Sequence, residues 1–167
     1  MRPAIAFVAL AIAGGAPAPS PWVKCTVVGA SNGIFEVSIE SPGAIDTQAH
    51  TTIVLEPHAP QPSAPSAAGY WAPVDLTTGR QYGANQPRHL ILKSGQRLVA
   101  ALSPTNLGWD RQISSAWPQR TLQEAVPPGR YSLHLEIEDT LSTHRARSNE
   151  LAVVVDEATI RTVQDKR

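Results

Sequence analysis

The sequence has very little cysteine and methionine. Its single cysteine, Cys25, cannot form a disulfide within the chain, and its one methionine is the first residue. A blue-copper site in a β-sandwich needs two histidines, a cysteine and usually an axial methionine. No histidine closely follows Cys25, so this class of copper protein is excluded. We interpret Cys25 as a small buried hydrophobic residue.

Charge is also sparse, and neither sign is in excess. Charged residues make up 17% of the chain, and fourteen basic residues balance fourteen acidic ones. A chain with this balance is not drawn electrostatically to nucleic acid or to anionic lipid. We therefore expect no nucleic-acid partner.

Long hydrophobic runs are missing, although the first residues resemble a processing signal. Arg2 precedes an apolar run at 4–13, and small residues follow at 14–18. This is the pattern of a secretory signal peptide, and the run is shorter than the roughly 20 residues that span a bilayer. We predict a signal peptide at 1–20, no transmembrane segment, and a periplasmic or secreted protein. The opposing interpretation is an N-terminal helix on a cytosolic protein.

Catalytic motifs are absent as well. The chain contains no Gly-x-Ser-x-Gly motif, and its glycine-containing stretch at 29–33 lacks the lysine of a phosphate-binding loop. Cys25 lies in an apolar stretch that we predict to be a strand, whereas a papain-like nucleophile opens a helix. We predict a non-enzymatic protein without a cofactor.

A strictly alternating run in the last quarter of the chain is the strongest pattern that is present. Leu133, Leu135 and Ile137 alternate with polar residues that include His134 and Glu136. A period of two with one apolar row is typical of a half-buried antiparallel strand. We expect the apolar row to face the core and His134 to be exposed to solvent on the opposite face. A polar loop at 139–147 should follow.

Several other short segments show strand patterns with turn residues between them. We predict strands at 22–28, 34–40, 51–56, 70–76, 89–92, 97–102 and 151–155. Most of the fifteen prolines fall between these segments, and the only helical candidate is a single capped turn at 121–125. The fold class is therefore predicted to be all-β, a sandwich of two antiparallel sheets with six to eight strands. It should occupy 21–157 and precede a frayed polar tail at 158–167.

The predicted core takes the inward apolar positions of these strands. Its members are Val27, Phe35, Val37, Ile39, Ile53, Leu55, Leu90, Leu92, Leu98, Leu133, Leu135, Ile137, Leu151, Val153 and Val155.

The predicted binding residues are aromatic or lie beside an aromatic residue. The segment 104–118, interpreted as a long loop, carries Trp109, Asp110, Arg111 and Trp117, and Trp71 follows a proline-rich stretch. Aromatic residues beside an arginine have the composition of an interface anchor. We predict these five residues as a protein-binding surface. The alternative is that the loop packs under the sandwich as a structural lid, and Trp71 or Trp109 is also the expected core tryptophan.

The closing third of the chain resembles a known class of domain. Val-Pro-Pro-Gly-Arg-Tyr at 126–131 and Ser-Asn-Glu-Leu at 148–151 resemble the last strands of immunoglobulin-like domains in exported bacterial proteins. The resemblance covers 122–155 and implies an immunoglobulin-like sandwich. It also implies that Tyr131 forms a tyrosine corner, in which its hydroxyl bonds to backbone upstream.

A second, smaller resemblance concerns function. Thr-Thr-Gly at 77–79 is similar to a loop of chagasin-like cysteine-protease inhibitors, although no Gly-x-Gly-Gly or Arg-Pro-Trp loop accompanies it. We predict an exported domain that recognises another protein through its loops, with peptidase inhibition as one form of this function. The alternative is a metal-binding or enzymatic protein in which folding brings His50, His58 and His89 together. No pattern indicates the oligomeric state.

Overall fold

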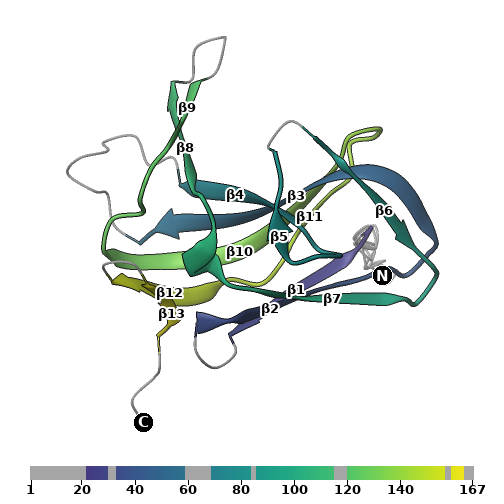
Figure 1. Ribbon diagram of the computed structural model, residues 1–167. Helices are drawn as coiled ribbons and strands as arrows, with labels where there is room; N and C mark the ends of the chain where they lie inside the picture. The colour runs from purple at the N-terminus through teal and green to yellow at the C-terminus, as the bar shows by residue number, and fades with distance from the viewer. Residues whose placement is uncertain are drawn as a thin grey trace, which may run out of the picture.

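The computed structural model describes residues 22–29, 33–58, 69–83, 86–114, 120–156 and 159–163. These residues form an all-β sandwich of two antiparallel sheets, one of three strands and one of ten (Figure 1). The predicted fold class is confirmed, but the described residues contain thirteen strands rather than six to eight. No helix in this part of the chain is long and apolar enough to cross a membrane.

The smaller sheet has the order β1-β2-β7. Its strands are β1 (Lys24–Gly29), β2 (Phe35–Glu40) and β7 (Arg97–Leu102). Strand β2 alternates as the sequence predicts, and Phe35, Val37 and Ile39 are buried against the larger sheet. The period of two therefore gives this sheet one face for the core.

The larger sheet has the order β13-β12-β10-β3-β4-β8-β9, while β11, β5 and β6 pair with β10, β4 and β3. Its strands, in chain order, are β3 (Ile45–Pro57), β4 (Tyr70–Asp75), β5 (Arg80–Gln81), β6 (Arg88–Leu92), β8 (Asp110–Ser114), β9 (Arg120–Gln123), β10 (Gly129–Asp139), β11 (Arg145–Arg147), β12 (Leu151–Asp156) and β13 (Thr159–Thr162). A short 3-10 helix, η2 (Pro104–Asn106), lies between β7 and β8.

Strands β3 and β10 form the centre of the larger sheet. They pair from Tyr131 and Pro57 to Asp139 and Ala49. Strand β3 is longer than predicted because its first half pairs with β6 and its second half with β4. Thr51 lies between these two pairings, and its N–H donates to the Tyr82 hydroxyl at 3.1 Å.

The core lies between the two sheets. Twelve of the fifteen predicted core residues are buried, and Leu90, Leu98 and Leu151 are partly buried against them. Cys25 is also buried, as predicted, and burial raises the pKa of its thiol to about 12. The thiol therefore stays protonated near neutral pH and acts as an apolar group.

The two motifs behind the immunoglobulin-like resemblance have clear structural roles. The buried Tyr131 hydroxyl donates to the Pro127 carbonyl at 2.8 Å, which confirms the predicted tyrosine corner. The Asn149 amide donates to the Val27 carbonyl and accepts from the Val27 N–H, both at 2.9 Å. Asn149 precedes β12 and Val27 belongs to β1, so this amide joins the two sheets.

The predicted exposure of His134 is wrong. Its side chain is 0% exposed, although it lies on the outward face of β10. Its Nε2 lies 3.0 Å from a Glu136 carboxylate oxygen, and its Nδ1 lies 3.4 Å from Nη2 of Arg147. Arg147 belongs to β11, a strand within the segment 139–147 that we predicted to be a loop. This extra strand lies beside β10 in the same sheet and brings the Arg147 side chain next to His134 on the outward face.

Two further local predictions are also wrong. The predicted helical turn at 121–125 is instead mostly strand β9, because pairing with β8 outweighs a local capping pattern. The predicted frayed tail contains β13, which pairs with β12 and buries Ile160. The β-branched residues Thr159, Ile160 and Thr162 favour this extended form.

Candidate binding site at the base of the β8–β9 hairpin

The segment at 104–118, predicted to be a loop, contains regular structure. It begins with η2 and continues into β8, which forms a hairpin with β9. The hairpin joins β4 only at its base, where Tyr70 pairs with Arg111 and Trp71 with Asp110. The two strands project from the rest of the larger sheet (Figure 1). The composition of this segment therefore indicates that it is unusual, but it does not predict the helix and the strand that the segment forms.

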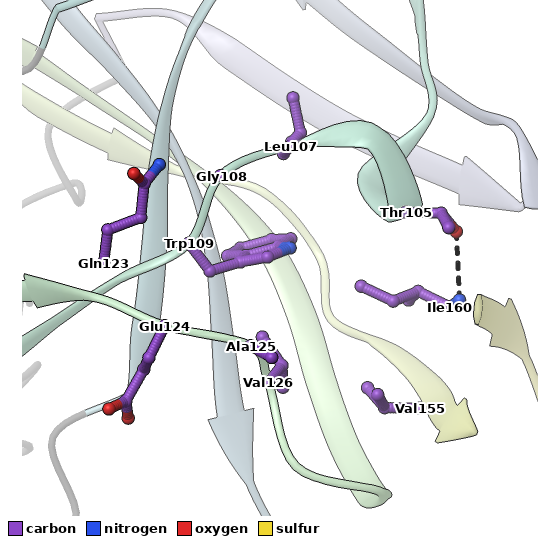
Figure 2. A pocket seen from close by; sticks show the side chains of 10 residues that line it. All are labelled: Thr105, Leu107, Gly108, Trp109, Gln123, Glu124, Ala125, Val126, Val155 and Ile160. Carbon is purple, nitrogen blue, oxygen red and sulfur yellow. Dashed lines mark hydrogen bonds between the residues drawn. The ribbon is translucent and has the colours of Figure 1, made fainter. Parts of the chain in front are cut away.

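A pocket of about 420 Å³ lies at the base of this hairpin. Figure 2 shows its lining, which comes from η2, β8, β9, β12 and β13 and the chain next to them. Strands β8 and β9 stand at one end of the strand order of the larger sheet, and β12 and β13 stand at the other. The sheet therefore curls until its two ends face the same pocket. The apolar lining consists of Leu107, Trp109, Ala125, Val126, Val155 and Ile160.

Trp109 forms much of the floor of the pocket. It is 4% exposed, and its indole N–H donates to the Pro104 carbonyl at 3.1 Å. Its own carbonyl accepts from the Glu124 N–H at 3.0 Å. In Figure 2 the indole lies between Leu107 and Ala125. Trp109 is thus the predicted core tryptophan and packs as the structural-lid alternative describes, while it still borders the pocket.

The polar groups at the pocket are engaged within the protein. The Thr105 hydroxyl accepts from the Ile160 N–H at 3.1 Å, the bond drawn in Figure 2. The Gly108 N–H and carbonyl both bond to the side-chain amide of Gln81, at 2.7 Å each. These contacts hold η2 against β13 and the start of β8 against β5.

Arg111 forms an ion pair with Glu124 beside the pocket. Nε of Arg111 contacts one carboxylate oxygen, and Nη2 lies 3.3 Å from the other. The two side chains are only 22% and 25% exposed. Tyr70 packs nearby, and burial together with the charge of Glu124 raises the pKa of its phenol to about 12. Arg111 is therefore a partly buried, neutralised cation and not an open anchor for a ligand.

Trp71 and Asp110 lie on the opposite face of their strands from this ion pair. They are direct neighbours across β4 and β8, and Trp71 is half-buried on the outward side of β4. Burial raises the pKa of the Asp110 carboxyl. Trp117 lies outside the described residues. The structure thus brings the four described site residues to one hairpin base but divides them between two faces.

Sequence reasoning missed the pocket residues outside the predicted loop. Val126 begins the Val-Pro-Pro-Gly-Arg-Tyr motif, and Ile160 lies in the predicted polar tail. Ile160 is the apolar residue in a short stretch rich in threonine, a pattern that favours a strand. The two ends of the larger sheet meet only because the sheet curls, and no local sequence pattern predicts this curl.

The histidines of the alternative hypothesis have separate partners. His58 Nε2 lies 3.0 Å from the Ser132 hydroxyl, whereas His89 bonds to Asp46. His50 pairs with Glu138 in the ladder between β3 and β10. In the part of the chain that the structure describes, no group of three histidine, cysteine or acidic residues could hold a metal ion.

A serine, a histidine and an aspartate lie together at the other end of β10. The Ser142 hydroxyl is 2.7 Å from Asp139 Oδ2 and 2.8 Å from His144 Nδ1. In a catalytic triad the imidazole lies between the other two groups and uses both of its nitrogens. Here the hydroxyl lies between the other two groups, and His144 Nδ1 is 3.8 Å from Asp139. This cluster braces the turn between β10 and β11.

The Thr-Thr-Gly sequence forms the turn between β4 and β5. Asp75 accepts from the Thr77 N–H at 2.8 Å, and Gly79 has a φ of 65°. A Cβ at Gly79 would lie 2.6 Å from the Ala101 carbonyl of β7, so glycine is required by both conformation and space. The conformation of the turn and its packing therefore account for this glycine.

No family model matches the chain, and no curated protein or solved structure matches it.

Proposed function

We propose that this protein is an exported, non-enzymatic binding module that recognises another protein through the pocket at the base of the β8–β9 hairpin. The observation that carries the proposal is an apolar pocket at the foot of a projecting hairpin, where both ends of the larger sheet meet. A binding module needs such a recess more than it needs reactive groups.

The surroundings of the pocket support recognition rather than chemistry. Its volume of about 420 Å³ falls within the usual range for ligand sites, about 300–1,000 Å³. Sheets hold the segments that line it, which is the common arrangement for recognition surfaces. The nearby cation, Arg111, is neutralised by Glu124. Peptidase inhibition is one form that this recognition could take.

The test is selection of random linear peptides on the purified protein, followed by affinity measurements on two matched variants. Ala125 is an exposed residue at the pocket, so Ala125→Arg should fill its mouth without disturbing the core. Ala44 is also exposed but lines a separate pocket near Asp139, and Ala44→Arg is the control.

We expect the selected peptides to bind Ala125→Arg at least about tenfold more weakly, a change of roughly 1.4 kcal/mol. They should bind Ala44→Arg as they bind the parent protein. Equal binding to the parent and to Ala125→Arg would refute this site. Failure to select any peptide would also count against the proposal.

Export is a separate part of the proposal and rests on residues 1–20, which lie outside the described residues. Signal processing should remove about 15–20 residues from the N-terminus. N-terminal sequencing of the protein recovered from its native host would check this. An intact Met1 on that material would contradict export through a cleaved signal peptide.

A further inference from the structure

We infer that the group entering the Trp109 pocket is an uncharged, apolar side chain of the partner protein. This inference rests on the proposed function and specifies the chemistry that the same pocket recognises. It follows from the state of the polar groups around the pocket, and from the way the floor closes.

Most polar atoms of the lining have partners within the protein. Gln123 also lines the pocket, and its amide is exposed but uncharged. The Trp109 indole N–H donates to Pro104, and the Thr105 hydroxyl accepts from Ile160. Both backbone groups of Gly108 bond to Gln81. None of these groups offers a counter-charge to an ionic ligand.

The two charges beside the pocket neutralise each other. Arg111 and Glu124 face each other, and both side chains are three-quarters buried or more. A ligand carboxylate would compete with Glu124 for Arg111, and a ligand ammonium would compete with Arg111 for Glu124. An ionic group entering the pocket would therefore lose water without gaining a partner, which is costly. An apolar group has no such hydration to lose when it enters the pocket.

The closed floor favours a side chain over a long acyl chain. Trp109, Val126, Val155 and Ile160 are each at most 7% exposed, so they end the pocket where the two ends of the sheet meet. A side chain needs only this short recess, whereas an acyl chain would need the recess to continue into the core.

Three small probes with the same carbon chain test the inference: hexanol, hexylamine and hexanoate. Each is titrated into the isotopically labelled protein while the Trp109 indole N–H and the Val155 and Ile160 amides are followed by NMR. We expect hexanol to shift these signals and both ions to bind at least about tenfold more weakly. Ala125→Arg should abolish the hexanol shifts, and Ala44→Arg should preserve them.

Two results would overturn the inference. The first concerns the probes: hexylamine or hexanoate binds as tightly as hexanol, or hexanol shifts signals away from the pocket.

The second concerns the length of the probe. We expect the affinity to level off for heptanol and octanol. A continued gain in affinity of about fourfold per methylene would indicate that the pocket takes an acyl chain. If selected peptides bind through the pocket but charged probes bind best, the ligand chemistry is wrong and the proposed function stands. If the peptides ignore Ala125→Arg, the proposed function itself fails.

Discussion

Strand β10 and the segment at 104–126 differ in how they build the molecule. In β10, apolar residues alternate with polar ones. The inner row packs in the core, while the outer row is largely exposed apart from His134, which is buried beside Glu136 and Arg147. In 104–126, apolar residues occur without alternation and form a short helix, a hairpin and a pocket floor. Regular alternation marks the framework of this protein, and its breakdown marks the candidate site.

This contrast separates stability from binding. Changes in β10 should alter the free energy of unfolding and leave ligand affinity intact. Changes at the exposed rim of the pocket should do the opposite, because the rim residues contribute little to the core. The predictions below test this separation, starting from the largest expected effect.

The inner face of β10 should show the largest effect. Leu135 is fully buried in the core, so Leu135→Ala should lower the free energy of unfolding by about 2–5 kcal/mol. Urea denaturation measures this change. Leu141, which is 76% exposed, supplies the control Leu141→Ala, expected within about 0.5 kcal/mol of the parent. Similar losses for both variants would show that the inner face is misassigned.

The outer face of β10 should show a smaller but clear effect. His134→Ala leaves Glu136 and Arg147 without their contacts to the buried imidazole. Glu136 and Arg147 are nearly half exposed and can be hydrated, so the expected cost of about 1–3 kcal/mol comes mainly from emptying the buried site of the imidazole. Glu138 lies on the same face and is half-exposed, so Glu138→Ala should change stability much less. If the two variants prove equally stable, the outer face is solvated and the framework has only one packed face.

The tyrosine corner joins β10 to the segment next to it. Tyr131→Phe removes the hydrogen bond to the Pro127 carbonyl and keeps the ring. The expected loss is about 1 kcal/mol, measured by thermal and urea unfolding against the parent protein. An unchanged stability would show that the hydroxyl contributes nothing to the junction between β10 and the pocket segment.

These variants also show how far sequence reasoning reaches. Alternation placed Leu133, Leu135 and Ile137 in the core, because the period of a strand determines which residues share a face. It failed for His134, because a period identifies a face but not what covers that face. The pocket was partly foreseen through Trp109, but its walls include Val155 and Ile160, which become neighbours of Trp109 only when the sheet curls.

The far end of β10 should respond to acid, and this is the smallest of the expected effects. Hydrogen bonds from Ser142, Thr47 and the Leu141 N–H lower the pKa of Asp139 from 3.8 to about 2. Because the folded protein favours the ionised form, this stabilisation is complete above pH 3.8. It is lost as the pH falls through about 2.

The comparison for this prediction is Asp139→Asn. The variant should be less stable than the parent at pH 6, and the difference should shrink as the pH approaches 2. Urea unfolding at a series of pH values measures the difference. A gap that stays constant with pH would show that the charge of Asp139 does not contribute.

The most direct test combines both regions in one experiment. The dissociation constant of the tightest selected peptide and the free energy of unfolding are measured for Ala125→Arg and for His134→Ala. We expect Ala125→Arg to lose at least about tenfold in affinity and to keep its stability within about 0.5 kcal/mol. His134→Ala, which empties a buried site, should lose about 1–3 kcal/mol of stability and keep its affinity. Equal affinity of the parent and Ala125→Arg for the peptide, or a loss of affinity only in His134→Ala, would contradict the assignment of binding to the hairpin base.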